Sequence, residues 1–159
     1  MNQLFLAILL SIAPLSELRG GIPVAIDYAI KNNLPALPFI MLIILANIII
    51  IFPVFFFLDK IHANLLKIKG YERFYKSYIK IIQNRVDKFE RNYAVYGFLA
   101  LMIFVAIPIP TTGAWTGTII SWLLGLERRK SIAAIVLGVI FAGVIVSLTS
   151  LGIFKLVLG

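Results

Sequence analysis

The stretch PLSELRGGIP at residues 14–23 decides the predicted fold, because it interrupts an apolar amino-terminal region. Two prolines and a glycine pair oppose a continuous helix there, and the charges of Glu17 and Arg19 are costly within lipid. The apolar arms on either side are short. Residues 4–13 would form a helix of only about 15 Å, and residues 24–30 a shorter one. Neither arm can cross a bilayer core of about 30 Å alone, so we expect a broken hairpin.

A long apolar run follows this hairpin, and the whole pattern then returns. Residues 36–58 are long enough to cross a bilayer. In the second half the break PIPTTG, at residues 108–113, separates the arms 93–107 and 114–126, and residues 131–158 form the second crossing run. The sequence therefore predicts an all-helical integral membrane protein in which each half is a hairpin plus one crossing helix. The residues expected to form the two breaks are Pro14, Gly20, Gly21, Pro23, Pro108, Pro110 and Gly113.

Composition and charge also indicate a membrane protein. Hydrophobic residues make up 61% of the 159 residues and charged residues 14%, which is too little polar surface to cover a soluble globule. The formal net charge of +8 raises nucleic acid as a partner, but nine of the 15 lysines and arginines lie between residues 60 and 91, and three more at residues 128–130. Basic residues in short loops beside apolar runs follow the positive-inside rule, so we expect no nucleic-acid partner.

The same charge rule favours a second hairpin that turns back inside the membrane. If it crossed, the charged loop at residues 127–130 would lie opposite the basic middle of the chain; if it turns back, both are cytoplasmic. Charge does not decide between a re-entrant and a spanning first hairpin, because no lysine or arginine precedes Arg19. The resemblance of the two halves favours a re-entrant one. Hairpins entering from opposite sides would form an inverted repeat, the layout of many secondary transporters.

The predicted organisation is one membrane domain with a basic linker in its middle. Repeat 1 is expected at residues 1–58, the linker at residues 59–92 and repeat 2 at residues 93–159. Within the linker, residues 71–89 carry an aromatic and aliphatic stripe opposite basic residues at helical spacing. A basic amphipathic helix of this kind suits a leaflet with anionic lipid headgroups. A helix packed on its own transmembrane bundle fits the pattern equally well.

The two breaks are the candidate site, because freed backbone groups at membrane depth must be buried in protein or line a wet cavity. Two roles are open for Glu17 and Arg19. In the first, Glu17 carries a proton and Arg19 contacts an anionic or polar group. In the second, the two form a static ion pair that holds the turn together. For Asp27, on the returning arm, a second proton carrier and a solvated helix end are both open.

The second break has no charge but offers hydroxyl groups and an indole. These groups would orient a polar substrate or satisfy freed carbonyls, and both roles stay open for Thr111, Thr112, Trp115 and Thr116. Asn47 lies midway along the first crossing run, where a contact between helices is the favoured interpretation over a ligand contact.

The sequence shows no catalytic constellation, and we expect no enzyme activity, no metal and no other cofactor. The chain has seven acidic residues, one histidine and no cysteine, whereas catalysis needs a nucleophile with a base or paired carboxylates. One imidazole cannot assemble a metal cluster, and we expect His62 in a solvated loop. The amino terminus lacks the basic region and cleavage site of a secretory signal, so we expect residues 4–13 to be retained.

Taken together, the strings PLSELRGGIP and PIPTTGAWTG, at residues 14–23 and 108–117, resemble the two signature segments of the small multidrug export protein family. The resemblance covers nearly the whole chain. This family is considered a distant relative of the DedA/VTT membrane proteins, which implies paired re-entrant hairpins and either lipid translocation or ion-coupled transport. In those relatives acidic residues lie in the first hairpin, as Glu17 does, and arginine in the second. No arginine occupies residues 108–117 here, so a lipid phosphate bound by such an arginine is not implied.

Three functions are compatible with these observations. The first is a proton-coupled transporter that moves a small polar or anionic substrate or exports amphiphiles, using Glu17 and Arg19. The second is a lipid flippase or scramblase of the DedA/VTT type, whose polar hairpins form a groove for headgroups. The third is a non-transporting scaffold or assembly factor that recruits a partner through the amphipathic helix. The partners expected are the lipid bilayer, anionic headgroups, protons or small ions, and further copies of the chain, because two crossings enclose little.

Overall fold

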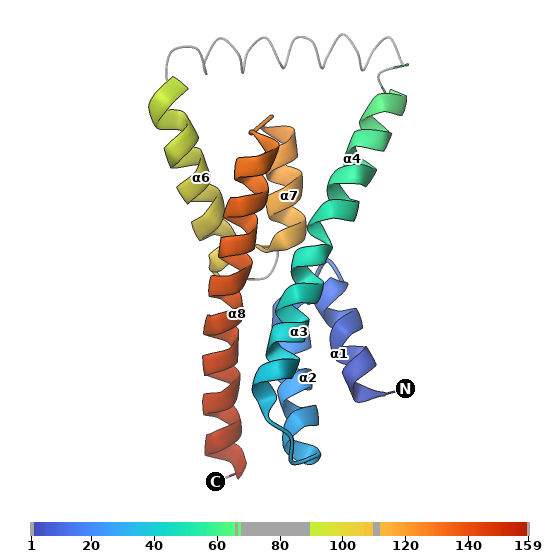
Figure 1. Ribbon diagram of the computed structural model, residues 1–159, viewed down its shortest axis with the longest axis vertical. Coiled ribbons are helices and arrows are strands. Elements are labelled where there is room, and N and C mark those ends of the chain that lie inside the picture. The colour runs from blue at the N-terminus through green and yellow to red at the C-terminus, as the bar shows by residue number, and fades with distance from the viewer. Residues whose placement is uncertain (1, 66, 68–89, 110–111, 159) are drawn as a thin grey trace.

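The computed structural model describes residues 2–65, 67, 90–109 and 112–158, and every element in this part is a helix, as the sequence predicts. The predicted amphipathic helix at residues 71–89 lies outside the described residues. The helices are shown in Figure 1 and comprise α1 Gln3–Ile12, α2 Glu17–Lys31, α3 Ala36–Ile49, α4 Ile51–Leu65, α6 Glu90–Ala106, α7 Ala114–Leu123 and α8 Arg128–Leu158.

Two helices are long and apolar enough to cross a membrane. Together α3 and α4 form the span Ala36–Asn64, with a mean hydropathy of 3.0, and α8 contains the span Arg128–Leu156, with a mean hydropathy of 2.7. Each span has 29 residues, or about 44 Å of helix, which exceeds a hydrocarbon core of about 30 Å. The α3–α4 helix is interrupted at Ile50, because the ring of Pro53 lacks the N–H that would bind the carbonyl four residues earlier.

The first long helix continues beyond residue 58, where the sequence predicted its end. His62 therefore lies in α4, and the expectation that it sits in a solvated loop is wrong. Its ring packs edge-on against Trp122 of α7, with 5.3 Å between ring centroids. On the same end of the molecule, Asp59 accepts hydrogen bonds from the Trp122 indole and from Arg128 of α8. These contacts tie α4, α7 and α8 together.

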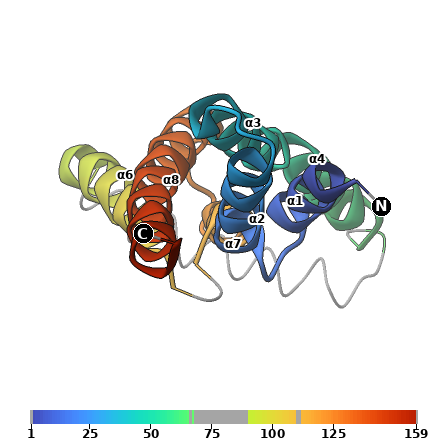
Figure 2. The same ribbon diagram turned by 90° about the horizontal axis from the view of Figure 1, so that it is seen from below.

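The shorter helices form two hairpins that enter the molecule from opposite ends. Figure 1 shows the α1–α2 hairpin at the lower end, the α6–α7 hairpin at the upper end, and their turns close to each other near the middle of the long axis. The view along that axis in Figure 2 shows α2 between its neighbours. It packs against α1, α3 and α8, whereas α7 packs against α4, α6 and α8. Both hairpins therefore pack against the long helices.

The first turn is shorter than the sequence indicates. Helix α1 ends at Ile12 because Ala13 precedes Pro14 and adopts extended backbone angles, with φ −68° and ψ 138°. Helix α2 then begins at Glu17 and continues to Lys31. Of the residues expected to form this break, only Pro14 does so; the others lie inside α2, and these are Gly20, Gly21 and Pro23.

Packing explains why a glycine pair lies within a helix here. A methyl group placed on Gly21 would lie 2.9 Å from the Ala7 carbonyl oxygen and 2.9 Å from Cγ2 of Ile43, well inside van der Waals contact. Glycine therefore lets α2 approach α1 and α3 closely. Pro23 deprives α2 of one backbone hydrogen bond, but the flanking Ile22 and Ala25 are fully buried. Burial of apolar surface therefore keeps α2 helical at Pro23.

The second turn runs from Ile107 to Gly113, with Pro108 inside it and Pro110 outside the described residues. The hydroxyl of Thr112 organises it. Oγ1 lies 2.6 Å from the Ile107 carbonyl oxygen and accepts a hydrogen bond from the backbone N–H of Ile109 at 3.2 Å. A side chain thus satisfies backbone groups that the interrupted helix has freed.

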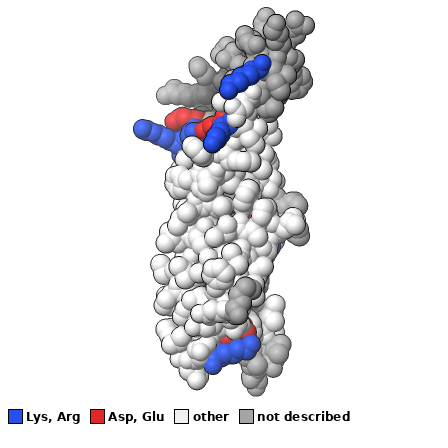
Figure 3. All heavy atoms as spheres, turned by 90° about the vertical axis from the view of Figure 1, so that its right-hand side faces the viewer, with Lys and Arg blue, Asp and Glu red and all other residues white. Residues whose placement is uncertain are grey.

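The surface is apolar over most of the length of the molecule. Large side chains on both long helices are widely exposed, including Phe56 at 68% and Leu148 at 66%. Figure 3 shows one face of the molecule, on which charged side chains gather near the two ends and leave the long middle nearly free of them. A contiguous apolar band of this extent is typical of a surface that faces lipid or other protein.

Candidate functional site

The two turns are joined by hydrogen bonds from one hairpin to the other. The backbone N–H of Trp115 donates to Oε1 of Glu17 at 3.2 Å. The guanidinium of Arg19 donates from Nη2 to the Thr112 carbonyl at 2.9 Å, and the Trp115 indole donates to the Ile12 carbonyl at 2.8 Å. The charges of the first hairpin therefore bind backbone groups of the second.

Glu17 is buried, with 4% of its surface exposed, and its carboxylate lies at the amino end of α7. The N-cap residue of that helix, Gly113, has no side chain to cap it. The amino end of a helix carries partial positive charge and free N–H groups, so the carboxylate of Glu17 serves as the cap from the opposite hairpin. When Glu17 is ionised, the amino end of helix α7 stabilises its negative charge.

The backbone of Glu17 is strained. Its φ angle is 45°, in the left-handed region that costs a residue with a side chain about 1–2 kcal/mol. Strain of this kind persists only where surrounding contacts hold it, and it is concentrated at functional sites. From this strained position the Glu17 carboxylate contacts the amino end of α7.

Gly113 leaves the space that this carboxylate fills. A methyl group built on Gly113 would lie only 1.5 Å from Oε2 of Glu17, so no larger residue is compatible with the observed position of the carboxylate. The sequence identified Gly113 as a helix breaker, but the structure adds that it is the floor of the Glu17 site.

Arg19 and Glu17 bind the second hairpin rather than each other. Between these two residues, both of which are in the described part, the structure has no ion pair, so the static ion pair considered from the sequence does not form. Arg19 is half-buried, and its positive charge faces the Thr112 carbonyl. The guanidinium has further N–H groups in a planar fork, which suits it to bind an anionic or polar group in addition to this carbonyl.

A small cavity lies where the turns meet α3 and α8. Its walls include Glu17, Arg19, Asn47 and Thr112, and α8 contributes apolar side chains, among them Val139. The space open to the centre of a water molecule is about 10 Å³, enough for about one water. The observed form of the site therefore has room for little more than one water molecule.

Asn47 is the residue whose position sequence reasoning did not fully explain. Its side chain is 0% exposed, and Nδ2 donates to the Ser11 carbonyl at 2.6 Å, which fits the predicted contact between helices. Its Oδ1 has no hydrogen-bond partner, and Asn47 lines the cavity together with Glu17. The available signal was a lone polar residue midway along the apolar run 36–58, but that pattern does not show which residues it faces.

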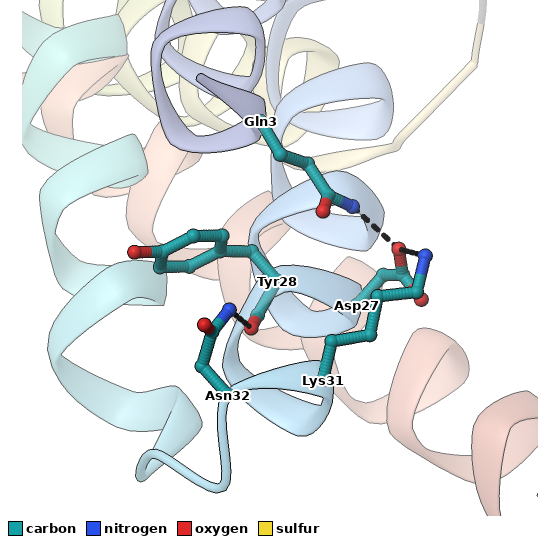
Figure 4. A network of polar contacts seen from close by, with 5 residues as sticks. All are labelled: Gln3, Asp27, Tyr28, Lys31 and Asn32. Atoms are coloured by element: carbon teal, nitrogen blue, oxygen red, sulfur yellow. Dashed lines mark hydrogen bonds and ion pairs between the residues drawn. The ribbon is translucent and has the colours of Figure 1, made fainter.

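Asp27 is remote from the site. It lies about 15 Å further along α2 than Glu17, at the end of the molecule, where Gln3 of α1 and Lys31 both donate to its carboxylate (Figure 4). The hydrogen bond from Lys31, which is 63% exposed, is the main reason why the pKa of Asp27 is lowered. The structure thus places Asp27 in a polar network at a helix end and not beside Glu17.

The remaining predicted residues divide between the site and its surroundings. Trp115 and Thr112 contact the first hairpin, as described above. Thr116 is half-buried in α7 and does not line the cavity, and Thr111 lies outside the described residues. Within the described ranges no three histidine or acidic side chains gather to hold a metal ion.

Two long apolar helices and a buried polar site between hairpin turns define this chain as a helical membrane protein. The sequence matches the family described as "Putative small multi-drug export protein" over residues 17–145, and the chain belongs to this family. The resemblance predicted from the two breaks is therefore confirmed. The family is one of membrane exporters and not of enzymes. No curated protein and no solved structure matches the chain.

Proposed function

We propose that this protein is a proton-coupled membrane exporter in which Glu17 carries the proton and Arg19 contacts a polar or anionic part of the substrate. The observation that carries the proposal is the buried carboxylate of Glu17, bonded across the molecule to the backbone of Trp115 at 3.2 Å. Ionisable groups at membrane depth mark ion and substrate pathways, and this one lies where the two hairpins meet.

The proposed membrane arrangement is an inverted repeat, with residues 1–58 and 93–159 as its halves. Helices α1 and α7 have 10 residues each, or about 15 Å, which is half of a bilayer core. Their hairpins turn near the middle of the long axis (Figure 1), which supports re-entrant hairpins entering from opposite faces. Under the positive-inside rule the linker at residues 59–92 and the loop at residues 127–130 are cytoplasmic, with the linker against anionic lipid headgroups.

Protonation would control how strongly the two hairpins hold each other. The ionised carboxylate of Glu17 accepts a charge-assisted hydrogen bond from α7 and interacts favourably with the amino end of that helix. When the carboxylate takes one proton from water, it becomes neutral and both interactions weaken. The turns can then separate, which frees Arg19 and the carbonyl of Thr112 for substrate. Relative movement of two repeats around a fixed central site is the usual form of alternating access.

The walls of the cavity favour an amphiphilic substrate. Val105, Val139 and Val146 contribute apolar side chains to the wall, and Arg19 contributes a positive charge. Since the observed cavity has room for about one water molecule, substrate must bind in a wider form of the site. Two long helices enclose little volume in a single chain, so we propose a homo-oligomer as the working unit.

The test is proton flux in proteoliposomes with a pH-sensitive dye inside, comparing the unaltered chain with Glu17→Gln. The substitution keeps the size of the side chain and an oxygen acceptor for the Trp115 N–H but cannot take up a proton. We expect flux to fall to the level of empty liposomes. The matched control is Glu127→Gln, because Glu127 is an exposed acid that pairs with Lys130 at the end of the molecule. Equal proton flux in the Glu17→Gln and unaltered proteins would contradict the proposal, and exchange of labelled lipid without proton flux would favour a flippase.

A further inference from the structure

We propose that Asn47 is the hydrogen-bond acceptor for protonated Glu17, so that proton binding moves the carboxyl group from α7 to α3. This inference rests on the proposed function, because it concerns the proton that Glu17 carries. It adds a positioning residue and a structural consequence: the same side chain would bind the second half of the chain when ionised and the first half when neutral.

The ionised and neutral forms of Glu17 need different partners. A carboxylate only accepts hydrogen bonds, and it accepts one from the backbone of Trp115. A neutral carboxyl group has an O–H that must donate, and a buried donor without an acceptor costs about 1–3 kcal/mol. On the cavity wall, the Thr112 carbonyl already accepts from Arg19. The neutral form of Glu17 therefore requires a free acceptor.

Asn47 offers that acceptor. Its Oδ1 is one of two buried side-chain polar atoms in the described residues that have no partner, and it belongs to a residue that lines the same cavity as Glu17. Nδ2 is fixed by its bond to the Ser11 carbonyl, so the amide cannot turn its oxygen away without breaking that bond. Buried amide oxygens are nearly always satisfied, so this oxygen is available to a donor inside the cavity, such as the carboxyl O–H of Glu17.

The proton balance of this step is simple. The carboxylate of Glu17 takes one proton from water that enters the open side of the site, and no other bond to the carboxyl carbon forms or breaks. The new O–H donates to Oδ1 of Asn47, directly or through the single water for which the cavity has room. Arg19 is the only other charged or titratable side chain on the cavity wall within the described residues, and in the observed form it is bonded to the Thr112 carbonyl.

Infrared difference spectroscopy of the full chain in lipid, titrated over pH, tests this assignment. The unaltered protein should show a carboxylic C=O band that rises as pH falls and is absent in Glu17→Gln. In Asn47→Leu the same band should move to higher frequency, because the carboxyl group has lost its hydrogen-bond acceptor. The matched control is Ser131→Ala, which removes the other buried polar atom without a partner and should leave the band in place.

The outcomes separate this inference from the proposed function. A Glu17 band that is present but unmoved in Asn47→Leu overturns the role of Asn47 and leaves proton carriage intact, whereas the absence of any Glu17 band removes both. If Asn47→Leu does not fold, the unaltered chain with 13C-labelled asparagine side-chain carbonyls provides the test. One labelled amide band should shift with the same pH midpoint as the Glu17 band, and a set of amide bands that does not respond to pH would overturn the assignment.

Discussion

The two turns at the centre of the molecule are built in opposite ways. The first hairpin contributes charged side chains at the start of α2, Glu17 and Arg19. The second hairpin contributes backbone groups, the Thr112 carbonyl and the Trp115 N–H at the start of α7, and the space left by the missing side chain of Gly113. At this contact the charged side chains of the first hairpin bind the main chain of the second, and the Trp115 indole of the second hairpin donates to the Ile12 carbonyl of the first. The first hairpin therefore determines the charge of the site, and the second hairpin determines its shape.

The largest effect is expected from changing the shape of the second turn. In Gly113→Ala the new methyl group would lie 1.5 Å from Oε2 of Glu17. Two atoms that are not bonded cannot come this close, so the carboxylate must leave the amino end of α7. We expect proton flux to fall to background and the free energy of unfolding to drop by about 1–3 kcal/mol, the usual cost of overpacking. The measurements are dye-reported flux in proteoliposomes and unfolding by SDS in mixed micelles.

Two further variants make this prediction specific. Gly97→Ala, in α6 of the same hairpin, adds a methyl group whose nearest neighbour outside that helix is Cδ2 of Leu126, 3.9 Å away. This variant should fold and transport normally. Glu17→Ala removes the carboxylate that clashes, so the stability lost in Gly113→Ala should be largely restored in the double variant. Additive losses in the double variant would show that Gly113 acts independently of Glu17.

A smaller effect is expected from removing the charge of Arg19, near the start of α2. Arg19→Met breaks the charge-assisted bond to the Thr112 carbonyl, which is 2.9 Å long, and should lower the free energy of unfolding by about 1.5–3 kcal/mol. Arg19→Lys keeps a donor and should lose less. The control is Arg129→Met, at an exposed position at the end of the molecule. Equal stability of the Arg19→Met and Arg129→Met proteins would show that the charge does not hold the turns together.

The smallest effect is expected at Asp27, where a charge lies outside the central contact. Because the Lys31 hydrogen bond lowers the pKa of Asp27 below its ordinary value of 3.8, the network in Figure 4 stabilises the fold fully above that value. This stability is lost as pH falls from 3.8 through the lowered pKa. Exposed ion pairs contribute about 0.2–1 kcal/mol, so SDS unfolding should show a small loss on acidification. Asp27→Asn should remove this loss of stability on acidification. If the stability of the two proteins depends on pH in the same way, the role of the Asp27 network is contradicted.

Much of the central contact could be predicted from the sequence, because charges and prolines inside apolar stretches are conspicuous. Glu17 and Arg19 lie between arms too short to cross a membrane, and Pro108 and Gly113 interrupt the second half. That the turns face each other was expected from the repeated pattern of hairpin and long run. These signals depend only on residues that are neighbours in the chain, so they can be recognised in a single sequence.

The extent of α2 and the partner of Asn47 could not be predicted, because both depend on tertiary packing. Gly21 and Pro23 oppose a helix locally, yet burial against α1 and α3 keeps them helical. Asn47 was expected to join helices, and its bond to Ser11 does so, but its free oxygen is evident only once the cavity is formed. At these positions tertiary packing, and not local helix propensity, determines the structure.

The direct test of this account is the side of the membrane on which the two connections lie. The chain has no cysteine, so Asn32→Cys and Arg129→Cys, both at exposed positions, can be labelled with an impermeant maleimide in sealed vesicles of known orientation. The account predicts that position 129 is labelled from the cytoplasmic side and position 32 from the opposite side. Labelling of both positions from the same side would contradict the opposed hairpins and, with them, a central site shared by the two halves.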